Sequence, residues 1–149
     1  EQGLPLRDAT VMLQREVADR LLARPGTSEY GVLAVLFQHV ADIDRRLNLP
    51  PGAFRPAPEV HSAVVTLRWH APAPPAQNLE LFRSLTRAVF TRRRKTLSNA
   101  LLAWGGQLLA PPSALLTACG IDPQRRPETL DVSEFVRLAD AVAAAAPPR

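Results

Sequence analysis

The 149-residue chain is 46% hydrophobic and 21% charged, carries a formal net charge of +4 at pH 7 and contains one cysteine. This length suits one domain, or a small domain with part of another, and the hydrophobic fraction excludes a largely disordered chain. The lone Cys119 excludes an internal disulfide and a multi-cysteine zinc site, and no apolar run approaches the roughly 18 residues of a membrane span, so we expect a cytoplasmic protein without membrane contact or metal.

The first half of the sequence has the pattern of an α/β fold. A short apolar run from Ala9 to Gln14 predicts a buried strand that passes directly into a helix. The segment that opens at Tyr30 predicts a second helix, and residues 42–49 alternate imperfectly, as in a strand. Residues 61–70, HSAVVTLRWH, are rich in β-branched residues and give the clearest strand. This order predicts the last third of a twisted α/β sheet, without its earlier strands.

Beyond this part, the sequence predicts a linker and then only helices. Residues 71–77, APAPPAQ, are proline-rich and mark a boundary between residues 1–70 and residues 78–149. Helices are expected over about residues 78–91 and 94–104, after Pro111-Pro112, and from about residue 132. The residues expected at their ends are Asn78, Ser113 and the box Asp131–Glu134 at the starts, and Gly105-Gly106, Gly120 and Pro147 after the last turns. Four such helices can form a small bundle.

The positive charge is concentrated in the second half. Residues 1–77 contain eight Lys or Arg and eight Asp or Glu, whereas residues 78–149 contain ten and six. Residues 83–95 hold no acid and six basic side chains, which are Arg83, Arg87, Arg92, Arg93, Arg94 and Lys95. Clustered cations repel one another unless an anion compensates them, and nucleic-acid phosphates are the commonest such anion. The cluster therefore predicts a phosphate-binding surface, with a solvated charged face as the alternative.

A stiff segment surrounds one aromatic residue. Residues 50–58, PPGAFRPAP, place four prolines around Phe54. Proline fixes its own φ near −65° and restricts the residue before it to extended geometry, so this arm holds the ring with little freedom. A connector that only turns the chain does not need such stiffness. Two interpretations stay open at this point: a ring tucked into the core, or a ring held ready for a ligand.

No other catalytic or cofactor pattern is legible. His39, His61 and His70 are 22 and 9 residues apart, which fits no metal template, and the sequence contains no G-x-G loop and no legible Ser-His-Asp arrangement. Cys119 has no histidine near it in sequence, which favours a buried structural thiol. Residues 48–50, Asn-Leu-Pro, match the start of a loop by which amino-methylating enzymes bind the target amine, but a proline follows where that loop has an aromatic residue. We therefore assign no catalytic, cofactor-binding or metal-binding residue to this chain.

Four ordered blocks resemble one known family. They are MLQREVADRLLARPGTSEYGVLAVLFQ, PPGAFRPAPEVHSAVV, FTRRRKTLSNAL and GIDPQRRPETLDVSEFVRLAD, and with their spacing they cover nearly all of residues 11–142. They resemble the ribosomal RNA adenine dimethyltransferases of the KsgA/RsmA type. The proline-rich block is shared with the wider family, including macrolide-resistance methylases and mitochondrial relatives, whereas RRKTL and GIDP indicate the bacterial ribosomal branch.

The resemblance implies a fold and a reaction. Such enzymes have a Rossmann-like methyltransferase domain followed by a small helical domain. They transfer methyl groups from S-adenosylmethionine to two adjacent adenosines of small-subunit ribosomal RNA. On that plan, residues 1–70 are the C-terminal part of the methyltransferase domain and residues 78–149 are an all-α RNA-binding domain. The glycine-rich cofactor loop is absent from this sequence, so the chain alone is expected to be inactive.

The resemblance also implies roles for residues already singled out. Phe54 matches the aromatic residue that packs on the flipped target adenine, and the residues expected to bind RNA are Arg87, Arg92, Arg93, Arg94 and Lys95. The expected partner is small-subunit ribosomal RNA in an immature small ribosomal subunit. Two alternatives stay open: a non-catalytic RNA-binding, ribosome-binding or transcription-factor-like relative, and a helical interaction domain without a role in RNA.

Overall fold

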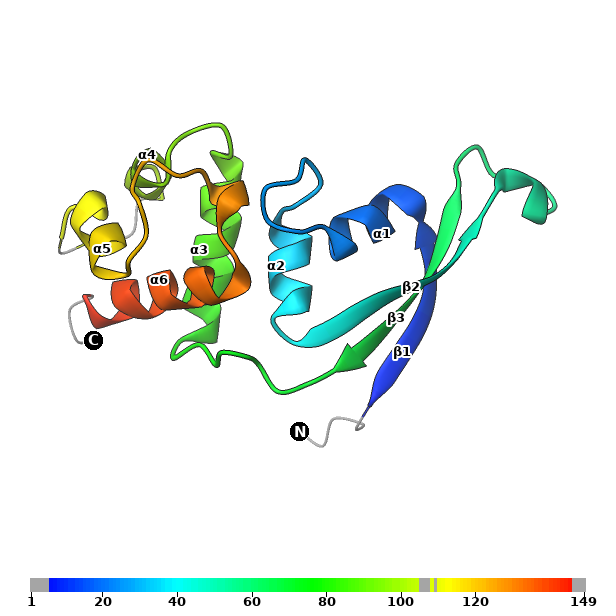
Figure 1. The fold of residues 1–149 in the computed structure, drawn as a ribbon, viewed down its shortest axis with the longest axis horizontal. Helices are drawn as coiled ribbons and strands as arrows, with labels where there is room; N and C mark the ends of the chain where they lie inside the picture. Colours follow the sequence, from blue (N-terminus) through cyan, green and yellow to red (C-terminus); the bar gives the residue numbers. More distant parts are fainter. Residues whose placement is uncertain (1–5, 105–107, 109, 146–149) are drawn as a thin grey trace.

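Figure 1 shows an α/β part at one end of the molecule and a helical part at the other. The structure is a computed structural model that describes residues 6–104, 108 and 110–145, so the helix ends expected at Gly105-Gly106 and Pro147 lie outside the described residues. The elements in chain order are β1 (Asp8–Gln14), α1 (Arg15–Leu22), α2 (Val32–Gln38), β2 (Ala41–Leu49), η1 (Pro51–Ala53), β3 (Ser62–Trp69), α3 (Leu79–Thr91), α4 (Leu97–Leu102), α5 (Pro112–Ala118), η2 (Pro127–Thr129) and α6 (Val132–Ala144). Among the described helices, none has the length and apolar character needed to cross a membrane.

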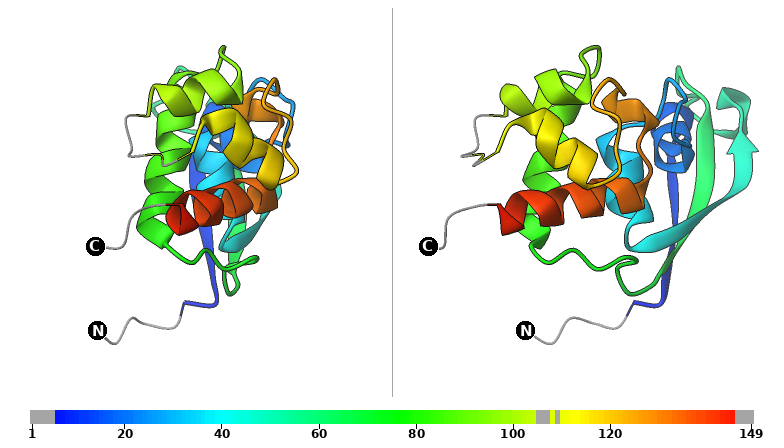
Figure 2. Two further views of the ribbon diagram at one scale, coloured as in Figure 1. Left: turned by 90° about the vertical axis from the view of Figure 1, so that its left-hand side faces the viewer. Right: turned by 60° about the vertical axis from the view of Figure 1, so that its left-hand side comes forward.

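The three strands form one sheet in the order β1-β3-β2. β3 pairs antiparallel with both neighbours, so the last strand in sequence is the central one. α1 and α2 lie on one face of this sheet (Figure 2), over a small core made of Ala18, Ala41, Ala63, Val65 and Leu67. The opposite face presents side chains such as Met12, which is 55% exposed. Within the described residues, helices thus cover a single face of the sheet.

β2 contains an irregularity that explains its imperfect alternation. The register shifts between Arg45 and Leu47, so Arg46 is an additional residue relative to β3. Ile43 lies opposite Leu67 and packs on the small core. Leu47, beyond the shift, lies opposite Val64 and is 57% exposed. Such a bulge changes which face the following side chains occupy.

The larger buried cluster belongs to the helical part but extends into the first half. It includes Phe82 of α3 and Phe135 of α6, and also Tyr30 and Val35 at the start and middle of the α2 segment. The ring of Tyr30 meets that of Phe90 edge-on, with 6.2 Å between centroids. The division at the linker stays a prediction, and these contacts show that the segments on its two sides pack against each other.

The capping signals read from the sequence are confirmed at two helices. The Asn78 side chain accepts a hydrogen bond from the Leu81 N–H at 2.9 Å. Asp131 and Glu134 form a reciprocal capping box at the start of α6. Each cap satisfies N–H groups that the first turn of a helix leaves unpaired. Gly120, with φ of +70°, lies just beyond the end of α5, where a left-handed residue favours glycine.

Two expected helix starts are wrong. α4 begins at Leu97, later than expected, because Thr96 caps it and the Leu97 N–H donates to the Arg125 carbonyl at 2.8 Å. α5 begins at Pro112 and has no side-chain cap, so Ser113 lies inside the helix. Proline suits the first helical position because the N–H that it lacks has no partner there in any helix.

Candidate nucleic-acid interface

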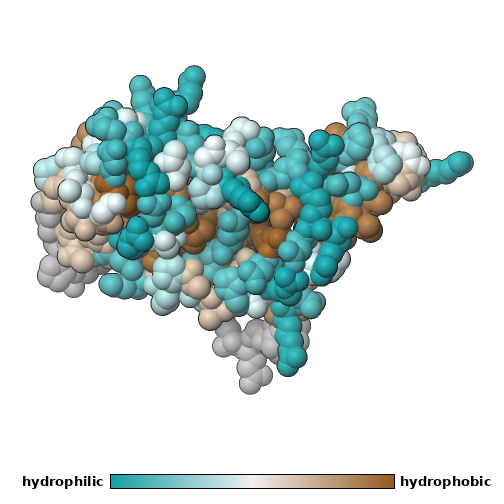
Figure 3. All heavy atoms as spheres, in the orientation of Figure 1, coloured by the Kyte–Doolittle hydropathy of each residue, from teal (hydrophilic) through white to brown (hydrophobic). Residues whose placement is uncertain are grey.

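The basic cluster lies where α3 ends. Arg92 leaves helical geometry, with φ of −113° and ψ of 31°. The chain then turns toward α4, and the Lys95 N–H donates to the Arg92 carbonyl at 2.8 Å. We refer to residues 92–95 as the basic turn. Arg92, Arg94 and Lys95 are exposed, and Figure 3 shows long hydrophilic side chains projecting from this side of the molecule.

The basic turn borders a small open hollow. Residues 91–95 line a volume of about 210 Å³, and no acidic residue lines it. In the part of the chain that the structure describes, Arg92, Arg94 and Lys95 form no ion pair, and neither does the exposed Arg87 of α3. A solvent-open hollow bordered by Arg92, Arg94 and Lys95, which are unpaired in the described structure, is the electrostatic complement of an anion such as a phosphate group.

Two of the six basic residues have acidic partners, which corrects the expectation of a wholly uncompensated cluster. Arg83 Nη1 lies 2.9 Å from Glu80 Oε1, one turn earlier in α3. Arg93 Nε lies 4.0 Å from Glu128 Oε2, and Arg93 Nη2 donates to the Thr27 carbonyl at 3.0 Å. The sequence of residues 83–95 does not reveal either partner, because Glu80 lies just before this run and Glu128 is distant from it in sequence.

Phe54 lies at the tip of the arm between β2 and β3. η1 precedes it, and the Phe54 N–H donates to the Pro51 carbonyl at 3.2 Å. The side chain is half-buried and belongs to neither buried cluster of the described residues. In Figure 1 the arm extends from the end of the sheet that is remote from α3–α6. The packing therefore gives no support to the interpretation of Phe54 as a core residue.

The structure does not bring Phe54 and the basic turn together. In Figure 1 the arm lies at the far right, whereas the turn between α3 and α4 lies at the top of the helical part. The loop between α1 and α2 lies between them along the upper edge of the molecule. Phe54 and the basic turn are therefore separate candidate sites on the surface of the chain.

Comparison with known proteins identifies the group to which these features belong. A family model described as ribosomal RNA adenine dimethylase matches residues 1–143. The chain belongs to this family. It is 45% identical over 139 residues to ribosomal RNA small subunit methyltransferase A of Pseudomonas fluorescens, and 43% identical over 147 residues to the protein of the same name from Geobacillus kaustophilus. These alignments cover 93% and 95% of this chain but 49% and 50% of the relatives, so the chain spans about half of their length.

Solved structures share the fold of this family member. A dimethyladenosine transferase from Plasmodium falciparum superposes with a TM-score of 0.75 and 24% identity, over 91% of this chain and 57% of that one. The 23S rRNA methyltransferase ErmE superposes with a TM-score of 0.57 and 22% identity, over 92% and 55% of the two chains. The three-stranded sheet and its helices are therefore an arrangement that methyltransferase structures contain.

The described residues do not fit S-adenosylmethionine, the methyl donor that the family implies. A nucleotide-binding loop of this fold class places glycines between a strand and the N-terminus of a helix. The glycines of the described residues are Gly26, Gly31, Gly52 and Gly120, and none lies in a strand-to-α-helix turn. β1 instead passes into α1 directly, with Gln14 as the residue before the helix. No step of methyl transfer is therefore assigned to residues of this chain.

Two of the three histidines, His39 and His70, form hydrogen bonds to backbone carbonyls, and the cysteine is half-buried. The Nε2 atom of the buried His39 lies 2.8 Å from the Pro74 carbonyl oxygen, and His70 contacts the carbonyl of its neighbour Ala71. Burial raises the pKa of the half-buried Cys119 thiol, against the weaker effect of the Arg137 charge. Within the described residues, no group of three or more His, Cys, Asp or Glu is placed to hold a metal ion.

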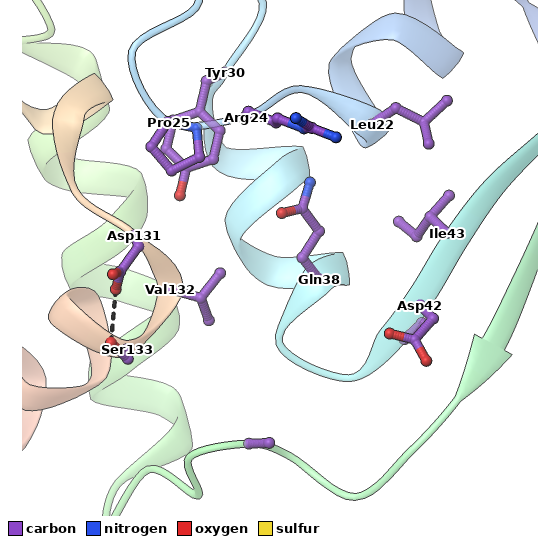
Figure 4. Close-up of a pocket in the computed structure, with 12 residues that line it drawn as sticks. Leu22, Arg24, Pro25, Tyr30, Gln38, Asp42, Ile43, Asp131, Val132 and Ser133 are labelled. Atoms are coloured by element: carbon purple, nitrogen blue, oxygen red, sulfur yellow. Dashed lines mark hydrogen bonds between the residues drawn. The ribbon is translucent and has the colours of Figure 1, made fainter.

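A second hollow involves residues that sequence reasoning did not single out. Its volume is about 620 Å³, and it is lined mainly by the end of α1 and the loop after it, by the start of β2 and by the start of α6. Figure 4 shows the Tyr30 hydroxyl directed toward the Asp131 side of this hollow. That hydroxyl is buried without a hydrogen-bond partner in the structure, and burial, followed by the charges of Asp131 and Glu134, raises the pKa of Tyr30. No sequence pattern around the single tyrosine indicates this placement.

A charged network holds the start of α6. Arg125 donates from Nη1 to Glu134 Oε1 at 2.6 Å and from Nη2 to Glu134 Oε2 at 3.0 Å. The Asp131 N–H also donates to Glu134 Oε2 at 3.0 Å. Partial burial acts to raise the pKa of Glu134, but the hydrogen bonds from Arg125 and from the Asp131 backbone, together with the Arg125 charge, outweigh it and lower that pKa. The capping box is legible in the sequence, whereas Arg125, nine residues before Glu134, gives no local signal.

Proposed function

We propose that this chain is the C-terminal half of an S-adenosylmethionine-dependent ribosomal RNA adenine dimethyltransferase that modifies two adjacent adenosines of small-subunit ribosomal RNA. The observation that carries this proposal is 45% identity, over 93% of the chain, to a protein named ribosomal RNA small subunit methyltransferase A. The proposed partner is the immature small ribosomal subunit, and the proposed compartment is the cytoplasm, where such subunits are assembled in bacteria.

The α/β part is, on this proposal, the end of a larger Rossmann-like sheet. Among the described strands β1 pairs only with β3, so its other edge has backbone N–H and C=O groups without a strand partner. Such an edge readily accepts a further strand. A strand from the rest of the protein would pair there, and S-adenosylmethionine would be held by that other half. This chain alone is expected to bind no cofactor and to transfer no methyl group.

Phe54 is proposed to hold the target adenine after it leaves the base stack. Extruding a base costs a few kcal/mol, and stacking on an aromatic ring returns about 1–3 kcal/mol. A ring returns this energy only if it is already in place. The prolines and η1 stiffen the arm, and the half-buried ring outside both cores keeps a surface for a ligand. The contribution of this chain to the reaction is thus to bind and orient the base.

The exposed side chains of the basic turn, together with Arg87, are proposed to bind ribosomal RNA phosphates. Arg87, Arg92, Arg94 and Lys95 are exposed and without an ion-pair partner in the described structure, and residues 92–95 border the hollow of about 210 Å³. Arg93 belongs to the same turn, although its side chain is already engaged. Contacts of this kind fix the position of the RNA and carry no base sequence information.

The test compares the complete protein with this chain alone. Both are incubated with immature small ribosomal subunits and a radiolabelled methyl donor, and calorimetry measures cofactor binding. We expect dimethylated adenines only with the complete protein, and no cofactor binding by the 149-residue chain. Micromolar cofactor binding by that chain, or no methylation by the complete protein, would contradict the proposal.

A second candidate function is RNA binding without catalysis. The exposed basic turn supports it, because this surface needs no cofactor and the described residues do not fit one. A complete protein that binds small ribosomal subunits with a strong salt dependence, yet transfers no methyl groups, would favour this alternative.

A further inference from the structure

The four residues of the basic turn have unequal surroundings. Arg92, Arg94 and Lys95 are exposed, whereas the Arg93 side chain is 36% exposed and contacts other parts of the chain. We propose that Arg93 is a positioning residue that fastens the basic turn to the loop of residues 24–31, and that it does not contact RNA phosphate. The statement about RNA rests on the proposed function, and the fastening does not.

Three segments meet at the Arg93 side chain. Its Nη2 donates to the Thr27 carbonyl of the loop at 3.0 Å, and its Nε lies 4.0 Å from Oε2 of Glu128 in η2. The Gly26 N–H of the same loop donates to the Glu128 carbonyl at 2.7 Å. The basic turn, the loop and η2 are thus tied to one another, although they are distant in sequence.

The charge of Glu128 favours the observed orientation of the Arg93 side chain, toward the chain and away from solvent. The Glu128 side chain is only 18% exposed, and within the described residues its buried Oε2 has no hydrogen-bond partner. A buried carboxylate oxygen is costly unless a cation compensates its charge. Among the described residues, Arg93 is the one cation within ion-pair distance of Glu128. Extending Arg93 toward a phosphate would therefore leave this acid uncompensated.

Packed aromatic rings support the same junction. Phe90 of α3 meets Tyr30 edge-on at 6.2 Å between centroids and stacks on Phe135 of α6 at 5.6 Å. Tyr30 lies at the end of the loop that Arg93 contacts, so the backbones on both sides are already held by packed rings, of which Tyr30 and Phe135 are buried and Phe90 is half-buried. Replacing Arg93 is expected to loosen the loop while the fold is retained.

The fastening has a consequence for how RNA is placed. The loop leads directly into α2, and α2 packs on the sheet from which the Phe54 arm extends. Arg93 therefore helps to fix the basic turn relative to Phe54. Its loss is expected to affect turnover of bound RNA more than RNA affinity, because the phosphate contacts themselves persist.

The experiment compares Arg93→Ala with the matched control Arg94→Ala in the complete protein. The measured quantities are the slope of log RNA affinity against log salt, KM and kcat for methylation, and hydrogen exchange of residues 24–30. For Arg94→Ala we expect a slope smaller by about 0.7–0.9, a higher KM and unchanged exchange. For Arg93→Ala we expect an unchanged slope, a lower kcat and exchange faster by about tenfold, because a hydrogen bond to a charged group is lost.

The charge-conserving variant Arg93→Lys separates the two roles further. A lysine retains the positive charge but lacks the planar guanidinium group, which contacts the Thr27 carbonyl and Glu128 at the same time. Hydrogen exchange of residues 24–30 is therefore expected to stay fast. A lysine at a phosphate contact would instead restore affinity and slope. The proposal is overturned if Arg93→Ala lowers the slope as much as Arg94→Ala and Arg93→Lys restores it.

The readouts also separate this proposal from the proposed function. If no variant of the basic turn changes the salt slope, the RNA role of the turn fails, while the exchange result still decides whether Arg93 fastens the loop. Unchanged exchange of residues 24–30 in Arg93→Ala overturns the fastening, whatever the RNA result.

Discussion

The ring of His39 at the end of α2 joins the linker to the helical part, because its Nε2 donates to the Pro74 carbonyl at 2.8 Å and its ring centre lies 4.6 Å from that of Phe82. His39 is 1% exposed, so its ring is shielded from water, whereas Pro74 is exposed. We expect His39→Ala to lower the free energy of unfolding by about 2–4 kcal/mol, through a lost buried hydrogen bond and a cavity. Urea unfolding measures this change.

The matched control for His39 is His70→Ala. His70 is half-buried, and in the described structure its ring forms one hydrogen bond, from Nδ1 to the carbonyl of the adjacent residue. This variant is expected to change the free energy of unfolding by less than about 1 kcal/mol. Equal decreases in the free energy of unfolding of the two variants would show that the contact between His39 and the linker adds no particular stability.

The network at the start of α6 predicts a loss of stability in acid. The pKa of Glu134 and that of Asp131 are lowered in the folded protein, despite partial burial, by hydrogen bonds and nearby arginines. A carboxyl with a lowered folded pKa contributes stability above its unfolded pKa and loses it as pH falls through the folded value. The free energy of unfolding should therefore decrease below about pH 4.5, the ordinary value for Glu.

The pH effect is checked by urea unfolding between pH 6 and pH 3. The variant Glu134→Gln keeps the shape of the capping side chain but cannot titrate. It is expected to be less stable at pH 6 and to show a shallower decrease in acid. An unaltered pH profile in this variant would assign the acid sensitivity to other carboxyls.

Replacing Phe54 should separate binding from chemistry. In the complete protein, Phe54→Ala is expected to lower methylation far more than RNA affinity, because the ring contributes its stacking energy, about 1–3 kcal/mol, only after the base is flipped. That energy corresponds to a rate lower by about 5- to 150-fold. Glu59→Ala, at an exposed position of the same hairpin, is the control and should retain activity. Equal loss of RNA binding and methylation in Phe54→Ala would indicate that the ring stabilises the fold and does not hold the target base.

Removing the exposed cations of the basic turn should change the salt dependence of RNA binding. The triple variant Arg92→Ala, Arg94→Ala and Lys95→Ala is expected to reduce the slope of log affinity against log salt by about two to three. The loss should be similar for cognate RNA and for scrambled RNA of equal shape. A triple alanine variant at Arg7, Arg20 and Arg68, exposed in the α/β part, removes the same charge and should keep the slope. Equal slopes in the two triple variants would contradict the RNA role of the turn.

The free edge of β1 predicts self-association of this chain when it is prepared alone. Val11 and Met12 are 37% and 55% exposed on that strand, whose outer backbone groups have no strand partner in the described sheet. Exposed apolar edges promote pairing between chains, and lysine opposes it. Light scattering should show oligomers for this chain and fewer for Met12→Lys. A monomeric, sharply two-state chain as stable as the complete protein would count against the prediction.

Local signals account for what the sequence predicts correctly. The β-branched residues within 61–70 indicate β3, and the Asn78 cap and the Asp131–Glu134 box indicate the starts of α3 and α6. Each of these signals depends on neighbours within a few residues. Membership of the family also follows from ordered blocks that the sequence itself displays.

Long-range contacts account for what the sequence does not reveal. The start of α4 depends on the Arg125 carbonyl, and the charge of Arg93 is compensated by Glu128. In sequence, Arg125 lies 28 residues after Leu97, and Glu128 lies 35 residues after Arg93. Tyr30 joins the helical core from the other side of the linker, which no periodicity within its own segment indicates. Such contacts exist only after the chain has folded, so a pattern read along the chain cannot reveal them.

The bulge in β2 determines which face of the sheet the apolar side chains near the Phe54 hairpin occupy. In a regular strand, Ile43, Leu47 and Leu49 would all face the small core, and the hairpin tip would have a polar outer side. Because Arg46 is additional, Leu47 and Leu49 lie opposite Val64 and Ser62, on the same side as the exposed Met12 of β1. The base of the Phe54 arm therefore presents apolar side chains on the open face of the sheet, the face without helices in the described structure. Deletion of Arg46 would restore the regular register and turn these side chains toward the small core.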